Sequence, residues 1–174
     1  MTGAVSGADV VRRAKNCDRA DIKGRAFFRG FFEDVELPEA HFDLVYMGDA
    51  FEHVHDPAAV ADKLVRVLAP GGVLILTTVD FGSWLARLLG RRWRLLSPPE
   101  HLHFWTRASV ERMFSERGLS AQLGNYWLYY PKSYIYQRTK LQFGIAPRFL
   151  ALLPGDVIPI PSFDALLGIF LKAA

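Results

Sequence analysis

The sequence of 174 residues predicts an α/β protein built on a parallel β-sheet. Two stretches, Phe42–Met47 and Val73–Thr78, are apolar almost throughout, as strands covered on both faces are. Between them, Ala58–Leu68 has apolar residues at helical spacing. A strand, a helix and a second buried strand in this order form the βαβ unit of a parallel sheet, joined by a right-handed crossover.

The helix between these strands has recognisable ends. Asp56 is expected to cap its N-terminus and Pro57 to occupy its first turn, and the turn Pro70–Gly72 is expected to stop it. Its buried face is expected to consist of Val60, Leu64, Val67 and Leu68.

The other elements are predicted from periodicity and turn residues. Thr106 is the expected cap of the last helix, and Gly118 its end. The predicted helices are Ala8–Lys15, Trp84–Leu89 and Arg107–Arg117, and the predicted strands are Arg25–Phe32, Leu119–Tyr130 and Ala165–Lys172. The segment Pro131–Ser162 has too many prolines for an assignment.

Composition limits the class of protein. The length suits a single domain over residues 1–174, and a net charge of +3 without a long basic block argues against nucleic-acid binding. Cys17 is the only cysteine, which favours a cytoplasmic location and excludes a disulfide framework. Prolines and acids interrupt the most apolar region, Phe149–Leu171, so we expect no transmembrane helix. Contact with a membrane surface stays open.

Polar residues gather directly after the two buried strands. Ligands of an open parallel sheet bind at the carboxyl ends of its strands. The residues expected at this edge are Gly48, Asp49, Glu52 and His53 after the first strand, and Thr77, Thr78 and Asp80 after the second.

Asp49, Glu52 and His53 share a face if they form one helical turn, because they stand at i, i+3 and i+4. Two carboxylates and an imidazole on one face suit a divalent cation. The alternative is local capping and pairing, with His53 packed under the sheet edge.

His101 and His103 are two residues apart, so in an extended segment they lie on the same side. Either is a candidate general base for a substrate hydroxyl. The alternative is a structural histidine that bonds a loop carbonyl. The sequence contains no GxSxG elbow and no GxxxxGK[ST] phosphate loop.

Three stretches together resemble the C-terminal two-thirds of a class I S-adenosylmethionine-dependent methyltransferase, over about Ala8–Leu123. They are ELPEAHFDLVYMGDAFEHVHDP, VRVLAPGGVLILTT and PPEHLHFWTRASVERMFSERGLS. The resemblance implies a Rossmann-like, mostly parallel sheet with an antiparallel last strand and helices on both faces. It also implies methyl transfer from S-adenosylmethionine to an oxygen or nitrogen of a small molecule.

The resemblance also assigns roles to residues. Phe32, Glu33 and Asp34 fall where the family contacts the adenine, and Met47, Gly48 and Asp49 where it contacts the methionine part of the cofactor. The HLHF segment and an insert at about 126–162 fall on the substrate side. In one branch of the family, an acid-x-x-Glu-His cluster like Asp49, Glu52 and His53 binds a divalent metal.

The sequence also departs from the family. It has no glycine-rich loop, its ribose-binding acid would fall at Ala4 or Val5, and the family's first strand has no counterpart. That strand would lie beside Phe42–Met47. We therefore expect either that Met1 is not the start of the working protein, or that a partner, a second copy or an altered sheet order covers this edge. The alternative function is therefore a truncated, non-catalytic remnant or scaffold module.

Overall fold

The computed structural model of this chain describes residues 31–144 and 147–174. The chain forms two compact units, one running up to Gly124 and resuming at Phe163–Ala174, the other comprising Asn125–Ser162. The predicted helix Ala8–Lys15 lies outside the described residues, as does most of the predicted strand Arg25–Phe32. Within that segment, Phe32 begins the 3-10 helix η1, Phe32–Asp34, where we expected the end of a strand.

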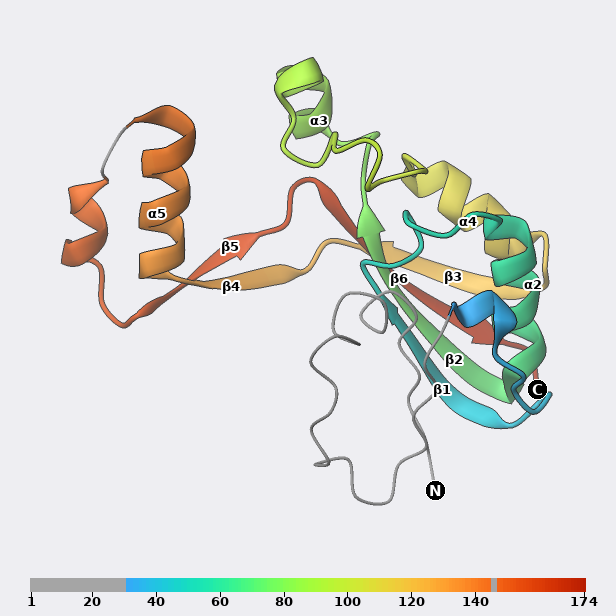
Figure 1. The fold of residues 1–174 in the computed structure, drawn as a ribbon. Coiled ribbons are helices and arrows are strands. Elements are labelled where there is room, and N and C mark those ends of the chain that lie inside the picture. The colour runs from blue at the N-terminus through green and yellow to red at the C-terminus, as the bar shows by residue number, and fades with distance from the viewer. Residues whose placement is uncertain (1–30, 145–146) are drawn as a thin grey trace. The chain divides into compact units, whose positions relative to one another are not determined.

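Within the described residues, the first unit contains a four-stranded sheet with the order β1-β2-β6-β3 (Figure 1). The strands are β1 (Phe42–Gly48), β2 (Leu68–Val79), β3 (Leu119–Gly124) and β6 (Ala165–Lys172). β1 and β2 are parallel, whereas β6 is antiparallel to both of its neighbours. The predicted parallel pair and the predicted antiparallel last strand are both confirmed.

Helix α2, Pro57–Val67, makes the crossover between β1 and β2. As predicted, Asp56 caps it, because one of its carboxylate oxygens accepts the N–H groups of Ala58 and Ala59 at 3.0 Å each. The turn Pro70–Gly72 lies within β2 rather than before it. There it forms an irregularity in the register with β1, and Gly71 has a φ of 73° that suits glycine.

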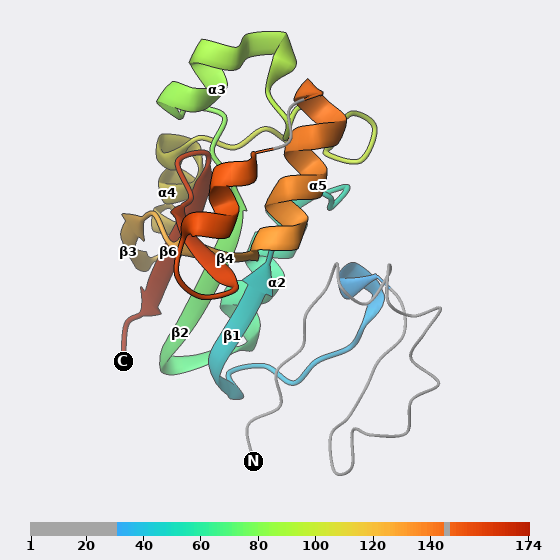
Figure 2. The same cartoon turned by 90° about the vertical axis from the view of Figure 1, so that its left-hand side faces the viewer.

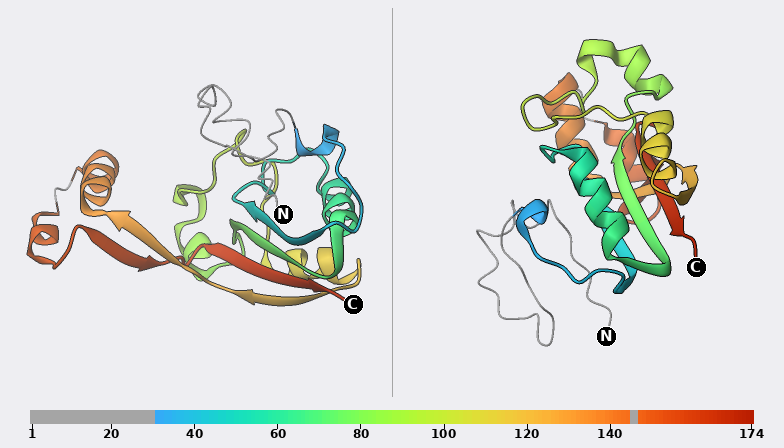
Figure 3. Two further views of the ribbon diagram at one scale, coloured as in Figure 1. Left: turned by 90° about the horizontal axis from the view of Figure 1, so that it is seen from below. Right: turned by 90° about the vertical axis from the view of Figure 1, so that its right-hand side faces the viewer.

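One face of this sheet is covered by α2 and by α4, Arg107–Ser115 (Figure 3). Thr106 caps α4 in a reciprocal arrangement with Ser109. The core beneath both helices is centred on three aromatic rings: Phe114 lies 5.7 Å from Phe51 and 4.5 Å from Phe170 between ring centroids. Burial of these rings holds the helices on the sheet.

The opposite face of the sheet is apolar but exposed. Leu44 and Tyr46 of β1 are 47% and 45% exposed, and Ile169 and Leu171 of β6 are exposed too. The prediction that β1 is covered on both faces is therefore wrong for the described part of the chain. The near-continuous apolar run was its basis, and such a run does not reveal which neighbour covers each face.

Beyond β2, the short helix α3, Trp84–Leu89, is followed by the 3-10 helix η2, Gly90–Arg92. A small second core of Val79, Ala86 and Trp93 anchors this region. The indole N–H of Trp93 donates to the buried Asp164 at 3.0 Å, and Arg94 pairs with the same carboxylate at 3.1 Å.

The second unit contains a two-stranded antiparallel ribbon of β4, Trp127–Pro131, and β5, Val157–Pro161. The chain between these two strands forms α5, Lys132–Phe143, and the 3-10 helix η3, Arg148–Leu152. These two helices lie side by side (Figure 2). The predicted strand Leu119–Tyr130 is thus two strands in different sheets, interrupted at residues 125–126. No helix among the described residues is long and apolar enough to cross a membrane.

Candidate functional site

The carboxyl ends of β1 and β2 meet, as predicted, since Gly48 pairs with Thr77 in the parallel register. The next residue, Asp49, turns the chain with a φ of 46°. Its N–H donates to the Thr77 carbonyl oxygen at 2.9 Å and is 3.1 Å from the Thr77 hydroxyl oxygen. These bonds fix the start of the loop Asp49–Val54.

Glu52 lies in this loop and is only 2% exposed. Its carboxylate accepts a hydrogen bond from the Thr78 hydroxyl at 2.7 Å, so the two strand ends are joined through side chains as well. Residues 49–54 form turns, not a helix. The premise that Asp49, Glu52 and His53 share a helical face is therefore wrong.

The segment Glu100–Trp105 packs onto this loop. The carbonyl oxygen of Glu52 accepts the N–H groups of Leu102 at 2.8 Å and His103 at 3.1 Å. The indole of Trp105 donates to the Phe51 carbonyl at 3.3 Å and stacks on the Phe51 ring at 4.8 Å. Two segments far apart in the sequence thereby form one wall of the site.

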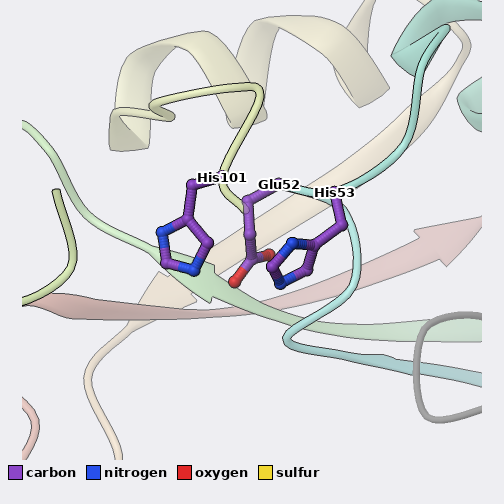
Figure 4. A group of neighbouring side chains, drawn as sticks. All are labelled: Glu52, His53 and His101. Carbon is purple, nitrogen blue, oxygen red and sulfur yellow. The ribbon is translucent and has the colours of Figure 1, made fainter. Parts of the chain in front are cut away.

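Glu52, His53 and His101 form a cluster at this wall, with one ligand atom of each within 4.8 Å of the others (Figure 4). The two imidazole rings are edge-to-face, with centroids 4.8 Å apart. His53 Nδ1 is 2.5 Å from the Glu100 carbonyl oxygen, and His101 Nδ1 is 2.7 Å from that of Leu95. A carbonyl accepts only, so each neutral ring carries its proton on Nδ1 and its lone pair on Nε2.

The other predicted site residues behave differently. His103 donates from Nε2 to the Val54 carbonyl at 3.0 Å and stacks on Trp105. Asp80 is buried, and its carboxylate pairs with Arg107 at 3.1 Å. Met47 belongs to the core, so a ligand beside it would meet backbone rather than its side chain.

Phe32, Glu33 and Asp34 make up η1, which is tied to α2. The ammonium of Lys63 donates to the carbonyl oxygens of Phe32 at 2.5 Å and Glu33 at 2.9 Å. Burial lowers the pKa of Lys63. The ring of Phe31 lies edge-on to that of His55, at 6.2 Å, which brings η1 close to the loop that follows β1.

Burial raises the pKa of Glu52, against the opposing effect of its hydrogen bonds. A carboxyl group whose folded pKa lies above its unfolded value costs stability once the pH exceeds the unfolded value. We therefore expect Glu52→Gln to stabilise the fold at neutral pH, and this gain to vanish below the ordinary value of 4.5. Urea unfolding of both proteins between pH 4 and pH 8 measures this difference in the free energy of unfolding.

Glu111→Gln provides the control, because Glu111 is exposed on α4. The free energy of unfolding of this variant should equal that of the parent at every pH. A Glu52→Gln protein that is less stable than the parent at pH 7 would show that an ionised carboxylate at this position supports the fold.

Comparison with known proteins adds to this geometry. Residues 4–122 match the family described as "Methyltransferase domain". Ubiquinone biosynthesis O-methyltransferase of Psychrobacter arcticus is 37% identical over 87 residues, which are 47% of this chain and 34% of that protein. The same enzyme of Thiobacillus denitrificans is 27% identical over 144 residues, which are 76% of this chain and 62% of that protein. The chain thus spans less than two thirds of these relatives.

Solved structures show the same fold at low identity. A SAM-dependent methyltransferase of Thermotoga maritima superposes with a TM-score of 0.62 at 16% identity, covering 98% of this chain and 82% of that one. A structure of the complex between the Haloferax volcanii Trm112 methyltransferase activator and a methyltransferase matches with a TM-score of 0.60 at 18% identity, covering 99% and 73%. With its matching sheet and its match over most of its length, the chain belongs to the methyltransferase-domain family.

Proposed function

We propose that this protein transfers a methyl group from S-adenosylmethionine to an oxygen or nitrogen of a small molecule. The observation that carries the proposal is the cluster of Glu52, His53 and His101 at the carboxyl ends of β1 and β2, in a chain of the methyltransferase-domain family. This edge is where ligands of open α/β sheets bind.

The residues present at this edge suit the cofactor. The backbone of Gly48 and Asp49 is fixed by Thr77, and the exposed carboxylate of Asp49 can pair with an ammonium group. Phe32, Glu33 and Asp34 would lie along the adenosine part, since η1 is held beside the loop after β1. When bound, the cofactor supplies a methyl group on a positively charged sulfur.

His101 is our candidate for the base that removes the acceptor's proton. Its lone pair is on Nε2, and its Nδ1 bond to Leu95 fixes the ring. Glu52 and His53 beside it would stabilise the imidazolium that forms. His103, the second candidate, holds the Val54 carbonyl, and we assign it a positioning role.

The same cluster also has the donors for a divalent cation, namely one carboxylate oxygen and two imidazole nitrogens. Each histidine is oriented by a carbonyl at Nδ1, as metal-bound histidines usually are. This donor set differs from the Asp49, Glu52 and His53 set expected from the sequence. An ion here would polarise an acceptor hydroxyl directly.

Other parts of the assignment are proposals as well. The aromatic insert at about 126–162 would lie on the substrate side. A partner or second copy would cover the edge of β1 that has no neighbouring strand in the described part of the chain. A cytoplasmic location is supported by the single Cys17.

Calorimetric titration of the 174-residue protein with S-adenosylhomocysteine tests the proposal. We expect a micromolar Kd, about −8 kcal/mol. Asp49→Asn should weaken binding by about tenfold, because it removes the charge while an asparagine tolerates the positive φ of this position.

Asp43→Asn, which removes an exposed carboxylate near the start of β1, should bind like the parent. No binding by folded protein would overturn the proposed activity and favour the non-catalytic scaffold.

A further inference from the structure

The second unit carries an exposed apolar surface on one side of its two-stranded ribbon. This ribbon face consists of three cross-strand pairs, which are Trp127 with Pro161, Tyr129 with Pro159, and Pro131 with Val157. Side chains that pair across strands project from the same face, and alternate residues share it. Trp127 is 58% exposed and Tyr129 is 68% exposed. Trp127 and Tyr129 are therefore not part of a hydrophobic core.

The 3-10 helix η3 adds further exposed apolar side chains to the same unit. Leu150 packs inward, whereas Phe149 and Leu152 are 62% and 86% exposed, and Leu153 next to them is also exposed. Exposed apolar side chains that gather in one unit mark a surface that contacts a protein or a membrane.

The charge of the chain is concentrated in this unit as well. Residues 125–162 contain four lysines and arginines and one aspartate, a net charge of +3. The whole chain also has a net charge of +3, so the remaining residues are neutral overall. Lys132, Lys140 and Arg148 thus lie in the same short unit as the exposed aromatic residues.

We propose that the second unit docks on the surface of an anionic lipid bilayer through the ribbon face and η3. Tryptophan and tyrosine favour the headgroup level, where an apolar ring meets a wet polar edge. Phe149 and Leu152 would enter the acyl boundary, while the basic residues attract anionic headgroups.

A second polypeptide is the less suitable occupant. Strand addition to an edge needs backbone N–H donors, and prolines in an edge strand oppose it. Pro159 and Pro161 of β5 lack these donors. At its β5 edge, the ribbon therefore offers side chains to a fluid surface more readily than a backbone edge to another strand.

Co-sedimentation of the whole chain with lipid vesicles tests the proposal. We expect binding to vesicles of phosphatidylcholine with phosphatidylglycerol, little binding to phosphatidylcholine alone, and weaker binding at high salt. Trp127→Ser with Leu152→Ser should lower the affinity at least about tenfold.

Trp84→Ser with Leu88→Ser is the matched control, because these residues of the first unit are 58% and 72% exposed. The control should bind like the parent. Equal losses from both double variants, or equal binding to both kinds of vesicle, would overturn the proposal.

Brominated phosphatidylglycerol gives a second readout that does not depend on affinity. It should quench tryptophan fluorescence, and Trp127→Phe should remove most of that quenching, whereas Trp84→Phe should retain it. Quenching that persists in Trp127→Phe would also overturn the proposal. So would a dimer that depends on Trp127 and Leu152, if the protein did not bind vesicles.

Discussion

Replacing His101 with alanine is expected to lower turnover by about 10²- to 10⁴-fold while the affinity for S-adenosylhomocysteine changes by less than about twofold. The reason is its place beside Glu52 and His53, with Nδ1 tied to a carbonyl and the lone pair on Nε2. Release of S-adenosylhomocysteine, with an acceptor that the parent protein methylates, measures turnover, and calorimetry measures affinity.

The pH dependence of kcat separates a base from a structural residue. The parent should lose activity toward acidic pH, where a general base becomes protonated, and His101→Ala should lose this limb of the profile. His103→Ala should keep the limb even if its loss of the Val54 bond lowers activity. Equal losses of turnover and cofactor affinity in His101→Ala would exclude the base role, and activity abolished by a chelator would assign the cluster to a metal.

Replacing Phe170 with alanine is expected to destabilise the fold by about 3–5 kcal/mol. Phe170 is fully buried on the helix-covered face of the sheet and packs against Phe114 at 4.5 Å. The cost combines lost burial with the cavity left between β6 and α4. Urea unfolding followed by circular dichroism measures it.

Leu171→Ala is the matched comparison, since Leu171 is the next residue of the same strand and lies on the exposed face. Its effect should stay within about 0.5 kcal/mol, as at other surface positions. A cost above about 2 kcal/mol would show that this face is covered in solution. The partner or second copy that we propose at the edge of β1 would then also contact this face of the sheet.

Local patterns predicted much of the first unit. Residues close in sequence determine these features, namely the apolar runs of β1 and β2, the start of α2 at Asp56-Pro57 and the cap of α4 at Thr106. The edge position of Thr77 and Thr78 also follows, because parallel strands end together. These parts need no knowledge of distant contacts.

The remaining features depend on contacts that no local pattern encodes. His53 and His101 meet because the Glu52 carbonyl, together with the Trp105 bond to Phe51, holds the segment Glu100–Trp105 against the loop that follows β1. The change of sheet between β3 and β4 occurs at Asn125 and Tyr126, directly after a glycine, and a Gly-Asn pair resembles any turn within a hairpin. The exposed face of β1 depends on what packs against it, which the apolar run itself cannot specify.

The two hydrogen bonds that the Glu52 carbonyl oxygen accepts have a consequence for a chain that is still being synthesised. The βαβ unit is complete once β2 has emerged, and it already contains Glu52 and His53. His101 arrives later, and its neighbour Glu100 lies 47 residues from His53, beyond β2 and α3. A nascent chain with a finished parallel pair therefore has two thirds of its cluster and none of the proposed chemistry, which begins only when the later segment docks.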